Sequence, residues 1–320
     1  MKQFAIMKHS VGWLFFWACL MIGSVVMFIV HMRRSIEFTG WVSVILNGVL
    51  EEQAVKSSVG EMMKELWYTD YNIGVTPDES ITTLLIKVGF KQDTDAIVLT
   101  DTLRKVLVDD AHLVSEDDIV SLSLIGPSIG DYMKKSAVSA LIIGLILMAV
   151  YMMISFSGIR RVIPPFTLAM VAIVTMLFDV SIPAGAYGIL MRLNSTIQID
   201  TVFIIAILTT MWYSINDTII VFDRIRENST NDQAWLRKNT ILMWKLIDVS
   251  LWQTLRRSIG TSFSTLLVVI AMYVFGSGVI QTFSFVVWFG IIAGTFSSMF
   301  VASPLVYILM WSYRKEQNKL

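Results

Sequence analysis

The sequence predicts a polytopic α-helical membrane protein with six transmembrane helices and one translocated α+β domain between the first two. Three observations lead to this class. The 320 residues are 55% hydrophobic, with a mean hydropathy of +0.67. The apolar residues form six runs close to or longer than the roughly 20 residues that a helix needs to cross the hydrocarbon core. Positive and negative charges are concentrated in different intervening segments.

The six apolar runs give the expected spans. The third and the sixth are long enough to tilt or kink, and they contain Pro183 and Pro304, residues that interrupt helical hydrogen bonding. In chain order, the spans are expected at Val11–Val30, Ala137–Phe156, Ile163–Leu190, Thr201–Phe222, Ile259–Phe275 and Val279–Trp311.

Charge predicts the orientation in the membrane. Residues 33–135 carry 17 acidic and 10 basic side chains, whereas residues 223–257 carry 7 basic and 4 acidic ones. Because positively charged loops stay in the cytoplasm, both termini are expected inside and the acidic segment outside. The expected parts are the N-terminus with the first span (1–32), the extracytoplasmic domain (33–135), spans two to six (136–312) with a cytoplasmic loop at about 223–257, and a cytoplasmic tail (313–320).

The translocated segment alternates strand and helix patterns. Helices are expected at Glu51–Leu66 and Thr100–Val108, because apolar residues recur there at helical spacing. The resulting β-α-β-β-α-β order predicts a ferredoxin-like domain. Its strands are expected at Val42–Leu46, Ile81–Val88, Ala96–Leu99 and Ile119–Ile125.

A Gly-Pro-Ser-Ile-Gly sequence follows the last expected strand and precedes the second span. Proline and glycine end the strand and permit a sharp turn into the membrane. The segment is either a plain linker or a hinge on which the domain swings, with Gly126, Pro127 and Gly130 as the hinge residues.

A carboxylate in the fourth span is the most informative single residue. Asp217 lies seven residues before Arg224, which places it in the inner third of the bilayer. An ionised carboxylate there costs several kcal/mol unless it is paired, hydrated or protonated, so it marks an ion or proton site. Tyr213 and Ser214 stack on its helix face and Asn216 adjoins it. These polar groups either form a proton path or serve helix packing.

Two further residues complete the predicted site. Arg257, at the start of the fifth span, can reach Asp217 by extending its side chain, with Thr261 continuing its face; alternatively, it is a positive-inside anchor. Asp179 is expected in the middle or outer half of the third span. If a movement separates Asp217 from Arg257, the proton affinity of the carboxylate changes, which would couple proton binding to motion.

Other functions have little support in the sequence. It contains no phosphate-binding glycine loop, nucleophile–histidine pair or metal-ligand cluster, so we expect neither an enzyme nor a metal or organic cofactor. Cys19 is the only cysteine, which excludes a disulfide within the chain. No nucleic-acid partner is expected. A proton is the expected coupling ion, with sodium as the alternative.

Several motifs, in order along nearly the whole chain, resemble the SecF family of protein-export subunits, whose six helices are half of a resistance-nodulation-division (RND) unit. The most specific motif is Tyr213–Asn228, which reads YSINDTIIVFDRIREN. Glu37, Trp41, Phe178 and Trp212 depart from the usual pattern of that family. The other matching motifs are Glu37–Gly40, Gly126–Gly130, Phe178–Val180 and Gln253–Ser258.

The resemblance implies a function that composition could not indicate. Such a subunit pairs with SecD and works beside the SecYEG channel, with YajC and YidC as further partners. It uses the proton-motive force to help move unfolded preprotein across the bacterial inner membrane. The resemblance implies that Asp217 and Arg257 form a proton-relay pair, with Asp179 as an additional acid. Two alternatives stay open: a proton-driven exporter of a lipid or small molecule, and a structural subunit whose acid no longer exchanges protons.

Overall fold

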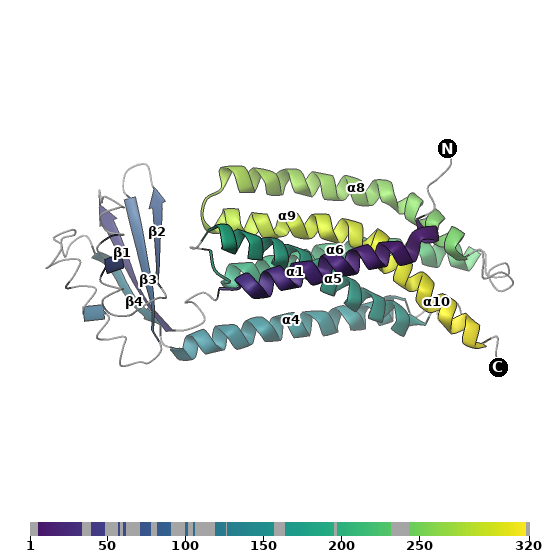
Figure 1. Ribbon diagram of the computed structural model, residues 1–320, viewed down its shortest axis with the longest axis horizontal. Coiled ribbons are helices and arrows are strands. Elements are labelled where there is room, and N and C mark those ends of the chain that lie inside the picture. Colours follow the sequence, from purple (N-terminus) through teal and green to yellow (C-terminus); the bar gives the residue numbers. More distant parts are fainter. Residues whose placement is uncertain are drawn as a thin grey trace. The chain divides into compact units, whose positions relative to one another are not determined.

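Six long helical segments and a four-stranded sheet form the described part of the computed structural model (Figure 1). The chain forms two compact units, one from residues 1–32, 140–197 and 202–320 and the other from residues 33–139 and 198–201. The structure describes residues 6–33, 40–48, 57, 60–61, 71–77, 82–90, 100–101, 105, 119–125, 127–156, 164–194, 197–231 and 243–317.

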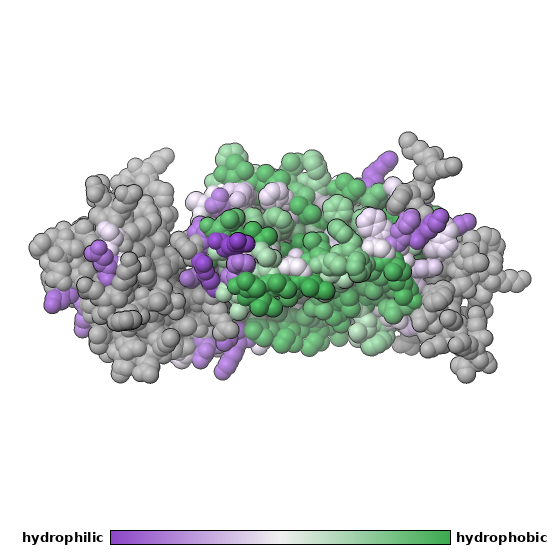
Figure 2. All heavy atoms as spheres, in the orientation of Figure 1, coloured by the Kyte–Doolittle hydropathy of each residue, from purple (hydrophilic) through white to green (hydrophobic). Residues whose placement is uncertain are grey.

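The described helices confirm the six predicted spans. Each of six helical segments is long and apolar enough to cross a membrane. Figure 2 shows a hydrophobic surface over the middle of these helices, with hydrophilic residues toward their ends. The helices are η1 (Met7–His9), α1 (Ser10–His31), α4 (Pro127–Ser155), α5 (Pro165–Leu193), α6 (Thr201–Asn231), α8 (Met243–Phe275), α9 (Val279–Ser297), η7 (Ser298–Ala302) and α10 (Ser303–Gln317).

The core of the bundle is formed by α5, α6 and the continuous segment of α9, η7 and α10. In an apolar 18-residue stretch of each of these spans, between 50% and 67% of the residues are buried. The corresponding share is 6% in α1, 11% in α4 and 17% in α8. The outer helices therefore present most of their apolar side chains to the surroundings, as expected in lipid. Buried polar side chains are consequently found mainly on the three central spans.

The sixth span changes its helical geometry ahead of Pro304. Residues Ser298–Ala302 form a π-helical turn between α9 and α10. Proline has no N–H and its ring clashes with the carbonyl four residues earlier, so a wider turn accommodates it. The Ser303 hydroxyl donates to the Ser298 carbonyl oxygen at 3.0 Å, which satisfies a carbonyl at the start of this turn. The predicted kink of this span thus has a local cause.

The segment between the fourth and fifth spans is more helical than predicted. α6 continues to Asn231 and α8 already begins at Met243, so most of the loop expected at 223–257 consists of helix ends. Pairs three residues apart stabilise the extension of α6: Arg224 with Glu227 and Arg226 with Asp223. Sequence hydropathy marks where a helix leaves the apolar region, not where it ends.

The sheet has the strand order β2-β3-β1-β4, and every neighbouring pair is antiparallel. The strands are β1 (Gly40–Gly48), β2 (Tyr71–Pro77), β3 (Thr82–Phe90) and β4 (Ile119–Ile125). Val42 of β1 lies opposite Val88 of β3, and both side chains are fully buried. The centre of the sheet therefore has an apolar cross-strand pair.

Three predicted strands coincide with β1, β3 and β4, but β2 was missed. Its sequence, YNIGVTP, contains glycine and proline, which normally argue against a strand. β2 lies at the edge of the sheet, where proline is tolerated because one side of the strand needs no hydrogen bonds. The strand predicted at Ala96–Leu99 lies outside the described residues. So do most of the two predicted helices, whose described positions are helical: residues 57, 60–61, 100–101 and 105.

Candidate functional site

Asp179 of α5 is buried in the centre of the helical bundle, with 1% of its surface exposed. The Ser214 hydroxyl of α6 donates a hydrogen bond to its Oδ2 atom, and Ser297 of α9 also lies beside the carboxylate. The Oδ1 atom has no hydrogen-bond partner among the described residues. The acid is thus held among three helices with part of its hydrogen-bonding capacity unused.

Asp217 lies one helical turn beyond Ser214 on α6 and is 3% exposed. The neighbouring helix α8 supplies the groups that act on its carboxylate, namely the Ser258 hydroxyl and the charge of Arg257. In the described part of the chain, Asp217 Oδ2 and Ser258 Oγ are both buried and outside ordinary hydrogen-bond geometry with any group. A small displacement of α8 would therefore suffice to form a hydrogen bond between Ser258 and Asp217.

Arg257 lies in an open cleft instead of beside the acid. The cleft has a volume of about 550 Å³ and lies between α4, α6 and α8. It comes within one helical turn of the site, because its lining includes Ile220, three residues after Asp217, and Thr254, four before Ser258. Among the described residues, no ion pair within 4.0 Å joins Arg257 to Asp217. The predicted pair is thus close enough to interact electrostatically but is not in direct contact.

A chain of hydroxyl groups crosses three helices beside these acids. The Tyr213 hydroxyl of α6 donates to Ser262 Oγ of α8 at 3.2 Å, and Ser262 Oγ lies 2.6 Å from Thr295 Oγ1 of α9. The Thr295 hydroxyl donates to the Ile291 carbonyl oxygen at 2.8 Å. Every hydroxyl then donates in the same direction, from Tyr213 to the carbonyl, and such aligned bonds reinforce one another.

Two glycines of α9 set its distance from α6. A Cβ atom added to Gly290 would lie 2.1 Å from Thr210 Cγ2, and one added to Gly294 would lie 2.8 Å from Ser214 Cβ. Both contacts are too short for any side chain, so the spacing Gly-x-x-x-Gly lets the two helices approach closely. This approach positions Ser214 against Asp179.

Asn216 and Thr261 do not join the site as predicted. Asn216 is exposed and lines a groove against α4, because adjacent residues of a helix point about 100° apart. Thr261 is also exposed, and its hydroxyl donates to carbonyls of its own helix at Arg257 and Ser258. Ser214 contacts Asp179 instead of extending a path from Asp217, and Tyr213 contacts α8.

The prediction missed the hydroxyl residues that do line the site, and a signal for them exists in the sequence. Ser250, Thr254, Ser258 and Ser262 recur every four residues along α8, and all are buried. A stripe of small hydroxyl residues on a span is typical of a helix that packs closely against others. The predicted inner face of α8 contains Arg257 and Thr261, whereas the buried face contains Ser258 and Ser262, one residue further along the helix.

The remaining predicted residues lie elsewhere. Pro127 and Gly130 form the first turn of α4, and Gly126 lies outside the described residues. The boundary between the two compact units falls inside α4, after Ser139. Among the described residues, no group of three or more histidine, cysteine, aspartate or glutamate side chains could hold a metal ion.

A six-helix bundle that buries two carboxylates and several hydroxyls on its central spans defines a multi-pass membrane protein with an ionisable core. The family model described as "Protein export membrane protein SecD/SecF, C-terminal" matches residues 105–312. The SecF translocase subunit of Acidaminococcus fermentans is 30% identical over 324 residues, covering 100% of both chains. That of Thermodesulfovibrio yellowstonii is 30% identical over 298 residues, covering 91% of this chain and 90% of the relative. The chain belongs to the SecD/SecF protein-export family.

Solved structures agree with this assignment. The crystal structure of SecDF from Thermus thermophilus matches with a TM-score of 0.70 and 26% identity, over 97% of this chain and 39% of that one. SecDF in its super-membrane-facing form matches with a TM-score of 0.67 and 26% identity, over 100% of this chain and 40% of that one. The chain therefore spans about two fifths of the SecDF chains it matches.

Proposed function

We propose that the protein is a SecF-type subunit that couples the proton-motive force to late-stage preprotein translocation across the bacterial cytoplasmic membrane. Relatives that match it over nearly their whole length are named translocase subunits SecF. The SecDF chains are more than twice as long, so a SecD-like polypeptide would supply the remaining part. The proposed SecYEG, YajC and YidC partners and the unfolded preprotein client follow from the family resemblance.

The two buried carboxylates carry the mechanistic proposal. Asp217 lies near a cleft that holds Arg257, and Ser214, one turn away, donates to Asp179. Buried ionisable residues in membrane spans mark proton or ion paths. In the proposed cycle, Asp217 gains a proton when α8 moves its cation away and loses it when Arg257 returns. Asp179 is the second acid of the path.

The sheet unit is proposed to be a ferredoxin-like extracytoplasmic domain. An order of β4-β1-β3-β2 with antiparallel neighbours is the arrangement expected of a β-α-β-β-α-β chain with two crossover helices. The acidic balance of residues 33–135 and the basic segments elsewhere support a translocated domain and cytoplasmic termini. Gly126, just ahead of α4, and Pro127 and Gly130, in its first turn, are the proposed hinge residues.

The test is preprotein translocation in vesicles that contain the channel, a SecD-like subunit and this chain. Asp217→Asn should lower the translocation rate under a proton gradient to the rate that the natural protein shows when an ionophore collapses the gradient. Asp223→Asn is the matched control, because Asp223 lies on the same helix, is exposed and pairs with Arg226. It should retain the gradient response.

An unchanged gradient response in Asp217→Asn would overturn the proton role of that residue. Replacing sodium with choline on both sides of the membrane separates the two coupling ions, because a sodium-driven subunit would lose its response and a proton-driven one would keep it.

A further inference from the structure

Two cavities adjoin on the surface of the helical bundle. The cleft between α4, α6 and α8 contains most of the charged groups at this end of α6 and α8. A second cavity, the groove, has a volume of about 470 Å³ and lies between α4 and α6. Tyr151 and Ile219 line both of them, so the cleft and the groove adjoin at these two side chains.

The cleft carries an excess of positive charge. It is lined by Arg224, Arg226 and Arg257 and by the carboxylates of Asp223 and Glu227. Two of the arginines have acidic partners, Glu227 for Arg224 and Asp223 for Arg226. In the described part of the chain Arg257 has no ion pair, so its guanidinium is the one available to an anion.

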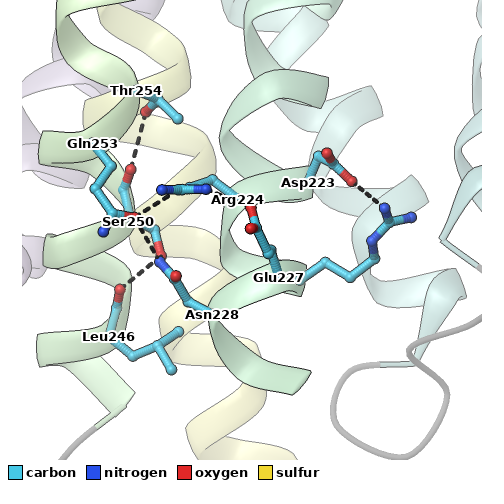
Figure 3. A network of polar contacts seen from close by, with 9 residues as sticks. Asp223, Arg224, Glu227, Asn228, Leu246, Ser250, Gln253 and Thr254 are labelled. Atoms are coloured by element: carbon cyan, nitrogen blue, oxygen red, sulfur yellow. Dashed lines mark hydrogen bonds and ion pairs between the residues drawn. The ribbon is translucent and has the colours of Figure 1, made fainter. Parts of the chain in front are cut away.

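A hydrogen-bond network holds one wall of the cleft in place. The Arg224 Nε atom donates to Gln253 Oε1 at 2.6 Å, and Asn228 Nδ2 donates to the same oxygen at 2.9 Å and to Ser250 Oγ at 2.8 Å. Figure 3 shows Arg224 reaching from α6 toward α8, while Asp223 leaves α6 on another side. The cleft is therefore a preformed feature of the α6–α8 pair.

The groove, in contrast to the charged cleft, is lined mainly by apolar side chains. Leu147 and Trp212 are 62% and 70% exposed in it, and they lie on spans that are expected to face hydrocarbon. Its lining residues with a polar group in the side chain are Asn216, Tyr151 and Trp212, and Tyr151 also lines the cleft. Its lining residues are Gly144, Leu147, Met148, Tyr151, Trp212, Ile215, Asn216 and Ile219.

We propose that the cleft and the groove together bind one anionic phospholipid. Its phosphate would lie in the cleft with Arg257, and an acyl chain would follow the groove along α4 and α6. Basic pockets between membrane helices on the cytoplasmic side are suited to anionic lipid headgroups, and arginine binds phosphate through two parallel hydrogen bonds. Each cavity is within the size range of ligand sites. This inference does not depend on translocation activity.

The adjacency of a charged cavity and an apolar one favours a lipid as the occupant. A free phosphate would use the cleft alone and would have no need of an apolar groove beside it. A zwitterionic lipid would fill the groove but gain little from the uncompensated arginine. An anionic phospholipid matches the charge of one cavity and the hydrocarbon surface of the other.

The test places the full chain in nanodiscs that contain lipids with brominated acyl chains, which quench nearby tryptophan fluorescence. The signal of Trp212 is the difference between the natural protein and Trp212→Phe, because the chain has ten tryptophans. At equal mole fraction, brominated phosphatidylglycerol should quench this signal more than brominated phosphatidylcholine. Arg257→Gln should lower the preference roughly fivefold, the effect of one basic residue at an anionic surface.

Arg256→Gln is the matched control, because Arg256 is exposed, adjoins Arg257 and is not part of the cleft lining. In native mass spectrometry, Arg257→Gln should retain one anionic lipid fewer than the natural protein, and Arg256→Gln should retain the same number. Equal quenching by both headgroups, or an equal effect of the two arginine variants, would overturn the proposal. So would competition by millimolar inorganic phosphate, which would identify a site for a free anion.

The same measurement on the chain bound to its SecD-like subunit tests a different occupant. Retained quenching with the preference for the anionic lipid supports the proposal in the assembled complex. Loss of all Trp212 quenching upon assembly would show that the subunit itself covers the groove, and the lipid site would then be rejected for the complex.

Discussion

The Ser214 hydroxyl of α6 donates a hydrogen bond to the Asp179 carboxylate of α5, and this contact brings Asp179 to a level of the bundle close to that of Asp217. Ser214 precedes Asp217 by three residues, a rise of about 4.5 Å along the helix. The acids therefore belong to one polar region that spans α5, α6 and α8.

The Ser214–Asp179 hydrogen bond should contribute measurably to stability. Ser214→Ala should lower the free energy of unfolding by about 0.5–1.5 kcal/mol, the usual net contribution of an intramolecular hydrogen bond. In an Asp179→Leu background the same substitution should cost close to nothing, because the acceptor is gone. Unfolding equilibria in mixed detergent micelles give the four values of this cycle. Equal costs in both backgrounds would mean that the bond does not stabilise the bundle.

Gly290 should not tolerate a side chain. Gly290→Ala places a methyl group 2.1 Å from Thr210 Cγ2, so the bundle should lose about 1–3 kcal/mol through overpacking. Gly260→Ala is the control, because nothing lies within 4 Å of the added carbon. Thr210→Ser, which removes the clashing methyl group, should restore part of the stability of Gly290→Ala. Similar melting temperatures for the two alanine variants would contradict the close approach of α6 and α9.

Within the hydroxyl chain, Ser262 should matter more than Tyr213. Ser262→Ala leaves both the Tyr213 hydroxyl and the Thr295 hydroxyl without their shared neighbour, whereas Tyr213→Phe leaves the Ser262–Thr295 contact in place. We expect a loss of about 1–3 kcal/mol for the first and about 0.5–1.5 kcal/mol for the second. Thermal unfolding of the two variants tests this order, and the reverse order would argue against the chain.

Asp248 should fasten the N-terminal segment to α8. Its Oδ1 atom accepts a hydrogen bond from the Met7 amide at 3.0 Å, and both groups are buried. Asp248→Ala should speed hydrogen exchange at the Met7 amide by between about tenfold and a hundredfold, because a bond to a charged group is lost. Asp248→Asn keeps an acceptor oxygen and should stay near the natural rate. Equal exchange in all three proteins would exclude this role.

The sequence was sufficient to predict the spans, because their lengths follow from the thickness of the hydrocarbon core. It was also sufficient to single out Asp179 and Asp217, since an acid inside an apolar run is conspicuous on its own. The helix ends beyond the membrane were not predictable from hydropathy. Arg224 and Glu227 extend α6 by local pairing, which a hydropathy profile does not detect.

The composition of the site was harder to predict, because a single helix does not reveal which neighbour each of its faces meets. Asn216 adjoins Asp217 in sequence but points into the groove against α4. Ser258 and Ser262 contribute to the site because α8 turns that face inward. Interhelical contacts such as Ser262 with Thr295 depend on the packing of separate segments, and periodicity along one helix gives only the candidates.

The glycine spacing on α9 has a mechanical consequence. Thr210 and Ser214 of α6 lie against Gly290 and Gly294 so closely that sliding or parting these helices would open voids that no side chain fills. We therefore expect α6 and α9 to move together as one unit that carries Asp217 of α6. Movement in the proposed cycle would then fall to α8, because its Ser258 and Arg257 act on Asp217 without a direct hydrogen bond or ion pair to it among the described residues.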